Sequence, residues 1–434
     1  MADIEPIRAL RYEPAVTGGL EPVIAPPYDV IDERQRAELA ARSPYNVVRI
    51  DLPQGGDDRY QRAATLLERW RREGAVVLDD GPAVWVLEQR YAGPDGLQRT
   101  RRGFLARVRV REYGPGSIRP HERTHPGPRE DRLRLTRATK ANLSPIFSLY
   151  SDPAGDARAA LELATAGEPW AQATDAERTH NRLWRVDDGP ILQALLEVAS
   201  ASELLIADGH HRYETARAYA EEVGGEGPHR WVLMCLVALE DPGLTVFPTH
   251  RLLALADDRQ RAALRAALMR DFVQVDGAAR AGGIGHSDDD ARAGDGSPGA
   301  AADPRGVVIG YLERGERQPR LLALKDQRLA DAALAGHAEP YRRLDTAVLE
   351  ALVLRGALGM RDADIDHMRG LTYIRERDRA IELVAGGEYD AGFLMSPIPV
   401  AQVRAIAAAG ESMPPKSTYF YPKVPTGLLF YPLA

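Results

Sequence analysis

Cysteine is scarce in this sequence, and long apolar runs and an excess of basic charge are missing. The single cysteine, Cys235, has no disulfide partner within the chain, and its place in an apolar run favours a small buried hydrophobe. No apolar stretch approaches membrane-spanning length, and residues 1–5 lack a signal-peptide pattern, so we expect a cytoplasmic protein with no membrane partner. A net charge of −7, spread over both signs, indicates no nucleic-acid partner.

The remaining composition is that of a globular chain, with 434 residues of which 44% are hydrophobic and 27% charged. Because this length exceeds one average domain, we expect three regions. They are an N-terminal α/β region (1–115), a catalytic core with a phosphate-binding turn (116–252) and a C-terminal α/β region that returns to the active site (253–434). Residues 281–305 are mostly Gly, Ala, Asp and Ser, which predicts a flexible insertion with too little apolar surface to fold.

The spacing of apolar residues predicts an α/β or α+β fold, with a mixed sheet and flanking helices. Residues 84–87 and 103–110 are predicted to be strands joined through a Gly-Pro-Asp-Gly turn. Residues 46–52 alternate as a strand does, and residues 155–200 have helical composition.

One stretch combines a strand end, a turn and several reactive side chains. An apolar run ends in Asp208-Gly209, and His210, His211 and Arg212 follow before a segment of helical composition. Strand, tight turn and helix start are predicted, and a helix start binds anions. The glycine lets a ligand approach the backbone, and the arginine can fork onto phosphate oxygens. The alternative is that Asp208 caps the helix while the histidines lie in solvent.

A second polar stretch contains the pattern H-E-x-x-H, from His121 to His125. That pattern binds zinc only on a continuous helix, where both histidines share a face. Pro120 precedes it and Pro126 follows at once, and proline disfavours helix in the residue before it, so we reject a zinc site. Loops rich in His and Glu are where chemistry tends to occur, which makes Glu122 a candidate. A solvated loop before a helix over 129–140 is the alternative.

A third candidate site lies near the end of the chain. Lys416, Ser417 and Thr418 follow two prolines and form a compact set of hydrogen-bond donors suited to a carboxylate or phosphate. An ordinary surface loop is the alternative for this segment.

Three separated segments resemble one family. The turn at 208–212 resembles the phosphate-binding turn of the ParB/sulfiredoxin-like superfamily, and more closely that of its free serine kinase branch, which makes phosphoserine with ADP. Residues 120–122 resemble the segment with that kinase's catalytic glutamate, and residues 387–390 followed by 415–418 resemble its C-terminal succession. The resemblance implies a ParB/sulfiredoxin-like core with additions at the N-terminus and in the middle.

Over nearly its full length the chain also resembles a bacterial family of unassigned function. Its signatures here are Pro-Pro-Tyr-Asp, Gly-Pro-x-Glu-Asp-Arg, Asp-Gly-His-His-Arg and Pro-Lys-Ser-Thr-Tyr-Phe-Tyr-Pro-Lys. Compared with the kinase, the gap between Glu122 and Asp208 is much longer, the first hundred residues have no clear counterpart, and Ser417 stands where the kinase has threonine. These departures leave the phosphate donor and acceptor open.

The kinase resemblance implies phosphoryl transfer from a nucleotide (ATP or ADP) to the hydroxyl of free L-serine. Glu122 would be the catalytic base, and Asp208 would help to hold Mg²⁺. The donor phosphates would be bound by Asp208, Gly209, His210, His211 and Arg212. The serine would be bound by Lys416, Ser417 and Thr418.

Two other activities stay open at this point. A ParB-like switch would bind CTP at the same turn without transferring phosphate, and a phosphatase would run the reaction in reverse. A sulfiredoxin-like repair role is rejected, because no cysteine stands beside the histidine of the turn. The oligomeric state, the pathway and the roles of Tyr28 and Asp29 are also open.

Overall fold

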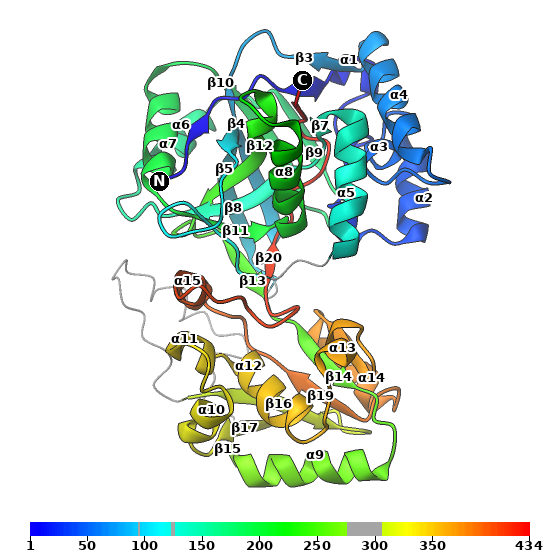
Figure 1. Cartoon of the computed structure of the whole chain (residues 1–434), viewed down its shortest axis with the longest axis vertical. Helices are drawn as coiled ribbons and strands as arrows, with labels where there is room; N and C mark the ends of the chain where they lie inside the picture. The colour runs from blue at the N-terminus through cyan, green and yellow to red at the C-terminus, as the bar shows by residue number, and fades with distance from the viewer. Residues whose placement is uncertain (94–95, 123–125, 276–305) are drawn as a thin grey trace. The chain divides into compact units, whose positions relative to one another are not determined.

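The computed structural model describes residues 1–93, 96–122, 126–275 and 306–434 (Figure 1). Within these ranges the chain forms two compact units. Unit 1 consists of Met1–Thr245 and Phe420–Ala434, and unit 2 consists of Val246–Tyr419. The chain passes from one unit to the other at strands β13 (Thr245–Phe247) and β20 (Tyr419–Tyr421).

This division differs from the three regions expected from the sequence. Strands on both sides of residue 115 share one sheet, so no boundary between compact units falls there. The chain leaves unit 1 after Thr245, seven residues before the predicted boundary at 252, and its last residues return to unit 1. The predicted insertion 281–305 lies outside the described residues.

Unit 1 is built on a mixed sheet, which has nine strands among the residues described. The main path follows the order β6-β11-β8-β12-β5-β4-β10-β9, and β1 pairs with β5. The pairs β6/β11 and β8/β12 are parallel, and the other neighbours are antiparallel. The strands are β1 (Ile4–Glu5), β4 (Val84–Ala92), β5 (Gln98–Arg109), β6 (Ile118–Arg119), β8 (Ile146–Tyr150), β9 (Ala171–Thr174), β10 (His180–Val186), β11 (Leu204–Asp208) and β12 (Trp231–Ala238).

Helices and two short strand pairs complete unit 1. The pairs are β2 (Leu10–Tyr12) with β3 (Val76–Leu78), and β7 (Ala141–Asn142) with β21 (Tyr431–Pro432). The helices are α1 (Pro14–Thr17), η1 (Tyr28–Val30), α2 (Glu33–Arg42), α3 (Val48–Asp51), α4 (Arg59–Arg72), α5 (Pro126–Thr139), α6 (Asp156–Ala164), α7 (Gly189–Ala201), α8 (His210–Val223) and η2 (Pro228–Arg230).

The two faces of this sheet are buried by different parts of the chain. Alternate residues of β12, such as Met234 and Leu236, pack in one core with residues of α6, α7 and α8. On the other face Phe147 of β8 contacts Phe420 of the C-terminal segment, with ring centres 6.1 Å apart. Burial on both faces explains why these strands are apolar along their whole length. The predicted mixed sheet with flanking helices is confirmed.

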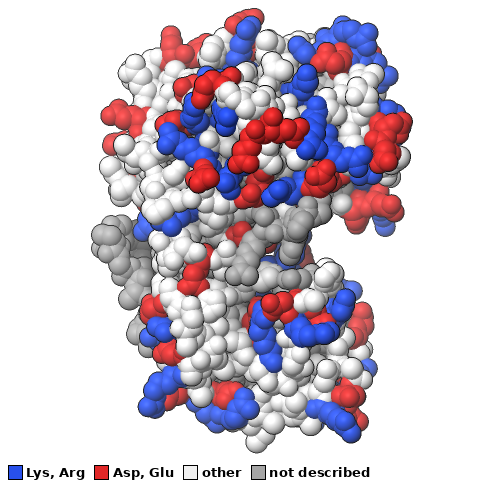
Figure 2. Space-filling model, viewed as in Figure 1, with Lys and Arg blue, Asp and Glu red and all other residues white. Residues whose placement is uncertain are grey.

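Helices α5 and α8 lie side by side on unit 1 (Figure 1). Their outer surfaces are joined by an ion pair in which Arg137 Nη2 lies 2.8 Å from Glu222 Oε2. On the face shown in Figure 2, acidic and basic side chains are interspersed, which favours such short-range pairing. Among the described residues, every helix is too short or too polar to cross a lipid bilayer.

Two local predictions failed for identifiable reasons. Residues 46–52 are not a strand but contain α3, because the Asn46 side chain accepts a hydrogen bond from Val48 N–H (3.0 Å) and donates one to Pro22 O (2.8 Å). The helical segment 155–200 is interrupted by the hairpin β9–β10. Asp175 forms the turn of that hairpin by accepting the N–H groups of Glu177 and Thr179.

Unit 2 contains an antiparallel sheet, which has six strands among the residues described, in the order β15-β17-β16-β19-β14-β18. Helix α14 covers one face of it, over a core that includes Leu252, Leu312 and Leu394. The strands are β14 (His250–Leu253), β15 (Phe272–Val275), β16 (Val308–Glu313), β17 (Arg320–Leu324), β18 (Leu371–Ile374) and β19 (Ala391–Leu394). The helices are α9 (Asp258–Asp271), α10 (Gln327–Ala333), α11 (Glu339–Arg342), α12 (Asp345–Leu349), η5 (Glu350–Arg355), α13 (Asp362–Asp366), α14 (Arg377–Ala385) and α15 (Val400–Ala408).

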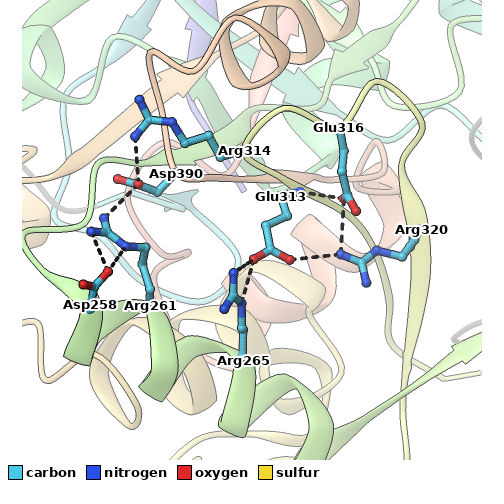
Figure 3. A network of polar contacts seen from close by, with 8 residues as sticks. All are labelled: Asp258, Arg261, Arg265, Glu313, Arg314, Glu316, Arg320 and Asp390. Atoms are coloured by element: carbon cyan, nitrogen blue, oxygen red, sulfur yellow. Dashed lines mark hydrogen bonds and ion pairs between the residues drawn. The ribbon is translucent and has the colours of Figure 1, made fainter.

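A network of charged side chains joins α9 to the strands of unit 2 (Figure 3). Arg261 of α9 lies 3.0 Å from Asp390, which also accepts a hydrogen bond from Leu255 N–H at 2.8 Å. One turn further along α9, Arg265 pairs with Glu313 at the end of β16. Single exposed pairs contribute about 0–1 kcal/mol, so the network mainly orients the helix.

Candidate functional site

The predicted strand, turn and helix are present at residues 204–223. Strand β11 ends at Asp208, Gly209 has a φ of +95°, and α8 begins at His210. The first helical hydrogen bond runs from Tyr213 N–H to Gly209 O at 3.0 Å. The N–H groups before it point out of the helix start, which is the arrangement that binds anions.

Asp208 is an ion-pair partner and not the helix cap. Its Oδ1 pairs with Lys423 Nζ and its Oδ2 with Arg212 Nη2, while the N-cap residue is Gly209. Burial would raise the pKa of Asp208, but Lys423 and Arg212 outweigh it and hold that pKa well below its usual range. The carboxylate therefore stays ionised at neutral pH.

The same two ion pairs occupy the carboxylate of Asp208 that is predicted to bind Mg²⁺. Among the described residues, no group of three or more His, Cys, Asp or Glu side chains is placed to hold a metal ion. Both oxygens of Asp208 already face cations. A Mg²⁺ ion there would displace one of them and take further ligands from phosphates and water, as Mg²⁺ commonly does.

Arg212 is mostly buried, with 10% of its side chain exposed, and is held on three sides. Its Nη1 donates to Ser144 Oγ at 2.9 Å and to Pro145 O, and its Nη2 donates to Asp208. Its Nε is buried without a hydrogen-bond partner among the described residues. A Cβ atom built at Gly209 would lie 3.0 Å from this Nε, so the Nε lies close to backbone that carries no side chain.

Two buried histidines lie beside the turn and reach the predicted base. His121 Nδ1 donates to Ile206 O at 2.6 Å, and His121 N–H donates to His210 Nε2 at 3.3 Å. Because that ring nitrogen accepts, the proton of neutral His210 is on Nδ1, which faces Glu122 Oε2 at 3.9 Å. The structure thus brings Glu122 and the turn together. Glu122 itself is 44% exposed, so a ligand can reach its carboxylate.

The histidine pair predicts an acid-sensitive fold. Burial lowers the pKa of His121 to about 4, and burial together with His121 lowers the pKa of His210 well below its ordinary value. An unfolded histidine takes up a proton near pH 6.5, so between pH 6.5 and 4 the unfolded state binds more protons. Stability should therefore fall as the pH falls through this window, by about 3 kcal/mol for His121 alone.

Urea unfolding at pH 7, 5.5 and 4.5 measures this effect. H121Q should lose stability less steeply over that range than the natural chain, by about 1.4 kcal/mol per pH unit. H180Q, at an exposed position of β10, is the control and should keep the original slope. Equal slopes for H121Q and the natural chain would contradict the prediction.

Gly209 is predicted to resist substitution for two separate reasons. A side chain at φ +95° is strained by about 1–2 kcal/mol, and its Cβ would press on Arg212. G209A should therefore be destabilised and should also lose about tenfold in phosphate-ligand affinity, because the Cβ blocks one donor. Gly224, at the other end of α8, has φ +69° but no described atom within 4 Å of a built Cβ. G224A should show the strain alone, in melting experiments, with unchanged affinity.

A cavity of about 40 Å³ adjoins Arg212 and is lined by residues that the sequence reasoning did not select. Tyr28, Asp51 and Arg132 lie on its wall. Arg132 Cζ is 4.3 Å from the centre of the Tyr28 ring, and Arg132 Nη1 is 3.2 Å from Asp51 Oδ1. Tyr28 belongs to the signature Pro-Pro-Tyr-Asp, and Arg132 belongs to the signature Gly-Pro-x-Glu-Asp-Arg. These signatures are the feature of the sequence that could have identified both residues.

The third predicted cluster belongs to unit 2. Ser417 is 3% exposed, which is not the surface loop considered as the alternative. Its Oγ donates to Thr346 Oγ1 at 3.2 Å and accepts from Arg251 Nη2 at 3.5 Å. Lys416 has a φ of +54°, and Lys416 lies outside unit 1 together with Ser417 and Thr418. The convergence of this cluster with Glu122 and Asp208 stays a prediction.

Comparison with known structures gives several matches at low similarity. A conserved hypothetical protein from Pyrococcus furiosus is 13% identical with a TM-score of 0.34, covering 71% of this chain and 90% of that one. A free serine kinase in complex with AMP is 13% identical with a TM-score of 0.33, covering 70% and 83%. SbnI with a C-terminal truncation, from Staphylococcus aureus, is 11% identical with a TM-score of 0.36, covering 74% and 85%. At TM-scores below 0.5, these matches carry no activity over to this chain.

Sequence comparison identifies the family. No curated protein matches the chain. Residues 4–347 match the model of a family described as "Protein of unknown function (DUF1015)". This match covers more than half of the chain and confirms the predicted membership in a family of unassigned function. The chain therefore belongs to the DUF1015 family.

Proposed function

We propose that this protein is a small-molecule kinase that transfers a phosphoryl group from a nucleotide, ATP or ADP, to the hydroxyl of free L-serine. One observation carries the proposal. A reachable carboxylate, Glu122, lies beside a helix start that holds a buried arginine with an unused donor. The motif resemblance to the free serine kinase branch supports the choice of serine as acceptor.

The donor phosphates would bind at the start of α8. The first N–H groups and the positive end of the helix dipole favour phosphate there, and Arg212 Nε–H supplies a further donor. Neutral His210 adds an uncharged donor on the Glu122 side. Preformed donors stabilise the charge that develops during transfer more effectively than water does.

Glu122 would act as the general base. The serine hydroxyl oxygen attacks the terminal phosphorus in line, a new P–O bond forms, and the bond from phosphorus to the leaving nucleotide oxygen breaks. The hydroxyl proton passes to Glu122, and the products are O-phosphoserine and the shortened nucleotide. Positioning and charge neutralisation supply most of the catalysis in such transfers.

Other residues would bind the acceptor L-serine and the Mg²⁺ ion. Lys416, Ser417 and Thr418 would bind the serine carboxylate, since lysine and hydroxyl donors suit that group. Mg²⁺ would enter with the donor phosphates and use one oxygen of Asp208, where it would supply positive charge to the transferring group. Ser417 donates its one hydroxyl proton to Thr346 in the structure, so it would have to turn that proton to the serine carboxylate on binding.

The test is phosphoserine formation from L-serine and Mg²⁺, with ATP, ADP, CTP and pyrophosphate supplied separately. Product with one donor supports the kinase and identifies the donor. Saturable CTP binding without phosphoserine would favour a nucleotide-dependent switch in place of the kinase. Release of phosphate from added phosphoserine, with no synthesis, would favour the reverse reaction.

A further inference from the structure

Lysine is rare in this chain and is concentrated near its end. Only four of its 56 basic Lys and Arg residues are lysines, namely Lys140, Lys325, Lys416 and Lys423. Two of the four belong to the signature Pro-Lys-Ser-Thr-Tyr-Phe-Tyr-Pro-Lys. Lysine differs from arginine in carrying a compact point charge with three donors on a flexible stem. Lys423 is therefore one of only four positions where this chain has an ammonium group in place of a guanidinium.

Lys423 reaches the turn from the C-terminal segment of unit 1. Its Nζ pairs with Asp208 Oδ1, and its side chain is 13% exposed. Its carbonyl oxygen accepts a hydrogen bond from Gln89 Nε2 at 3.1 Å, which fixes the backbone at the sheet. Three residues earlier, the Phe420 ring lies against His121 with centres 5.6 Å apart. The segment is therefore anchored at Lys423 itself and three residues before it.

The ammonium group of Lys423 lies beside the predicted phosphate-binding turn, because it pairs with Asp208. Asp208 carries Lys423 on one oxygen and Arg212 on the other, so two cations flank the end of β11 next to the start of α8. Lys423 also lines a second small cavity, together with Pro26, Pro27 and Glu177.

We propose that Lys423 binds the terminal phosphates of the donor nucleotide, and that Asp208 holds it in position until they arrive. During transfer its charge would stabilise the oxygen that leaves with the shortened nucleotide, while the phosphoryl group passes to the acceptor hydroxyl and the proton to Glu122. This inference rests on the proposed kinase function and adds a donor-binding residue that the motif resemblance does not supply.

Titration calorimetry with AMP, ADP and ATP tests the role of Lys423. K423M should lose about 10- to 100-fold in affinity for ADP or ATP, as expected for one charge-assisted hydrogen bond, and less than threefold for AMP. K140M changes an exposed lysine of the same unit and should bind all three nucleotides unchanged. An equal loss for AMP and ATP, or no loss, would overturn the assignment.

A second variant separates binding from folding. K423R keeps a cation on Asp208, so its melting temperature should stay near that of the natural chain. Its phosphoserine formation should still fall at least tenfold, because the guanidinium cannot place a compact charge at the same point.

Full activity of K423R and K423M would overturn the inference and leave the kinase intact. A third outcome is that the natural chain makes no phosphoserine while K423M selectively loses affinity for ATP. That outcome would support Lys423 as a phosphate ligand and reject the kinase. If the natural chain binds none of these nucleotides, both proposals fail.

Discussion

Replacing Glu122 with glutamine is expected to slow phosphoserine formation by about 10²- to 10⁴-fold, the usual contribution of a positioned general base. The amide keeps the size of the side chain and cannot take the hydroxyl proton. The 3.9 Å distance from Glu122 Oε2 to His210 Nδ1 is too long for a strong hydrogen bond, so the substitution breaks no such bond between these two residues. Initial rates at saturating serine and donor measure the effect.

Nucleotide binding distinguishes a base from a binding residue. E122Q should bind the donor within about threefold of the natural chain, since removing a carboxylate does not remove a phosphate ligand. E130Q, at an exposed position of α5, is the matched control and should keep full activity. Loss of donor affinity in E122Q would assign Glu122 to binding, and an undiminished rate would reject it as the base.

Replacing Arg212 with methionine is expected to weaken donor binding strongly and to destabilise unit 1. The variant loses donors to Ser144, Pro145 O and Asp208 in a buried setting, which predicts a decrease of about 2–4 kcal/mol in the free energy of unfolding. Lys423 still pairs with Asp208, so the loss stays below that of an isolated buried charge. Donor affinity should fall by about 10²- to 10³-fold. Chemical denaturation and calorimetry measure the two effects.

Two comparisons make this result specific. R217M, five residues later in α8, changes a less buried arginine whose Nη1 lies 3.5 Å from Glu214, and it should leave donor affinity unchanged. In R212M/D208N the losses of stability should be less than additive by about 1 kcal/mol or more, because the two residues share one ion pair. Strict additivity would mean that the Asp208 pair does not stabilise the buried arginine.

Several features of the site could be predicted from the sequence because their causes are local. An apolar run, Asp-Gly and a helical segment specify the strand, turn and helix at 204–223, and the left-handed φ of Gly209 is what such a turn requires. The hairpin of β4 and β5 follows from two apolar runs and a turn signal in the same way. Glu122 could be selected as a candidate by its chemistry and by the motif resemblance. Its position next to His210 could not be predicted from the sequence.

Local patterns failed where a distant partner decides the conformation. Residues 46–52 alternate like a strand, yet the hydrogen bond from Asn46 to Pro22, 24 residues away, favours a helical turn. Tyr28, Asp51 and Arg132 come from three separate segments and meet at one cavity only in the folded unit. No spacing within any one segment could have indicated that meeting.

The choice of ion-pair partners was also made by the tertiary structure. The sequence by itself determined that Asp208 ends a strand next to an arginine, and that a lysine closes the last signature. Only the fold joined Asp208 to Lys423, which lie 215 residues apart. The physical reason is that hydrophobic periodicity and turn chemistry act over a few residues, whereas a buried carboxylate pairs with whichever cations the packing of the sheet brings within reach.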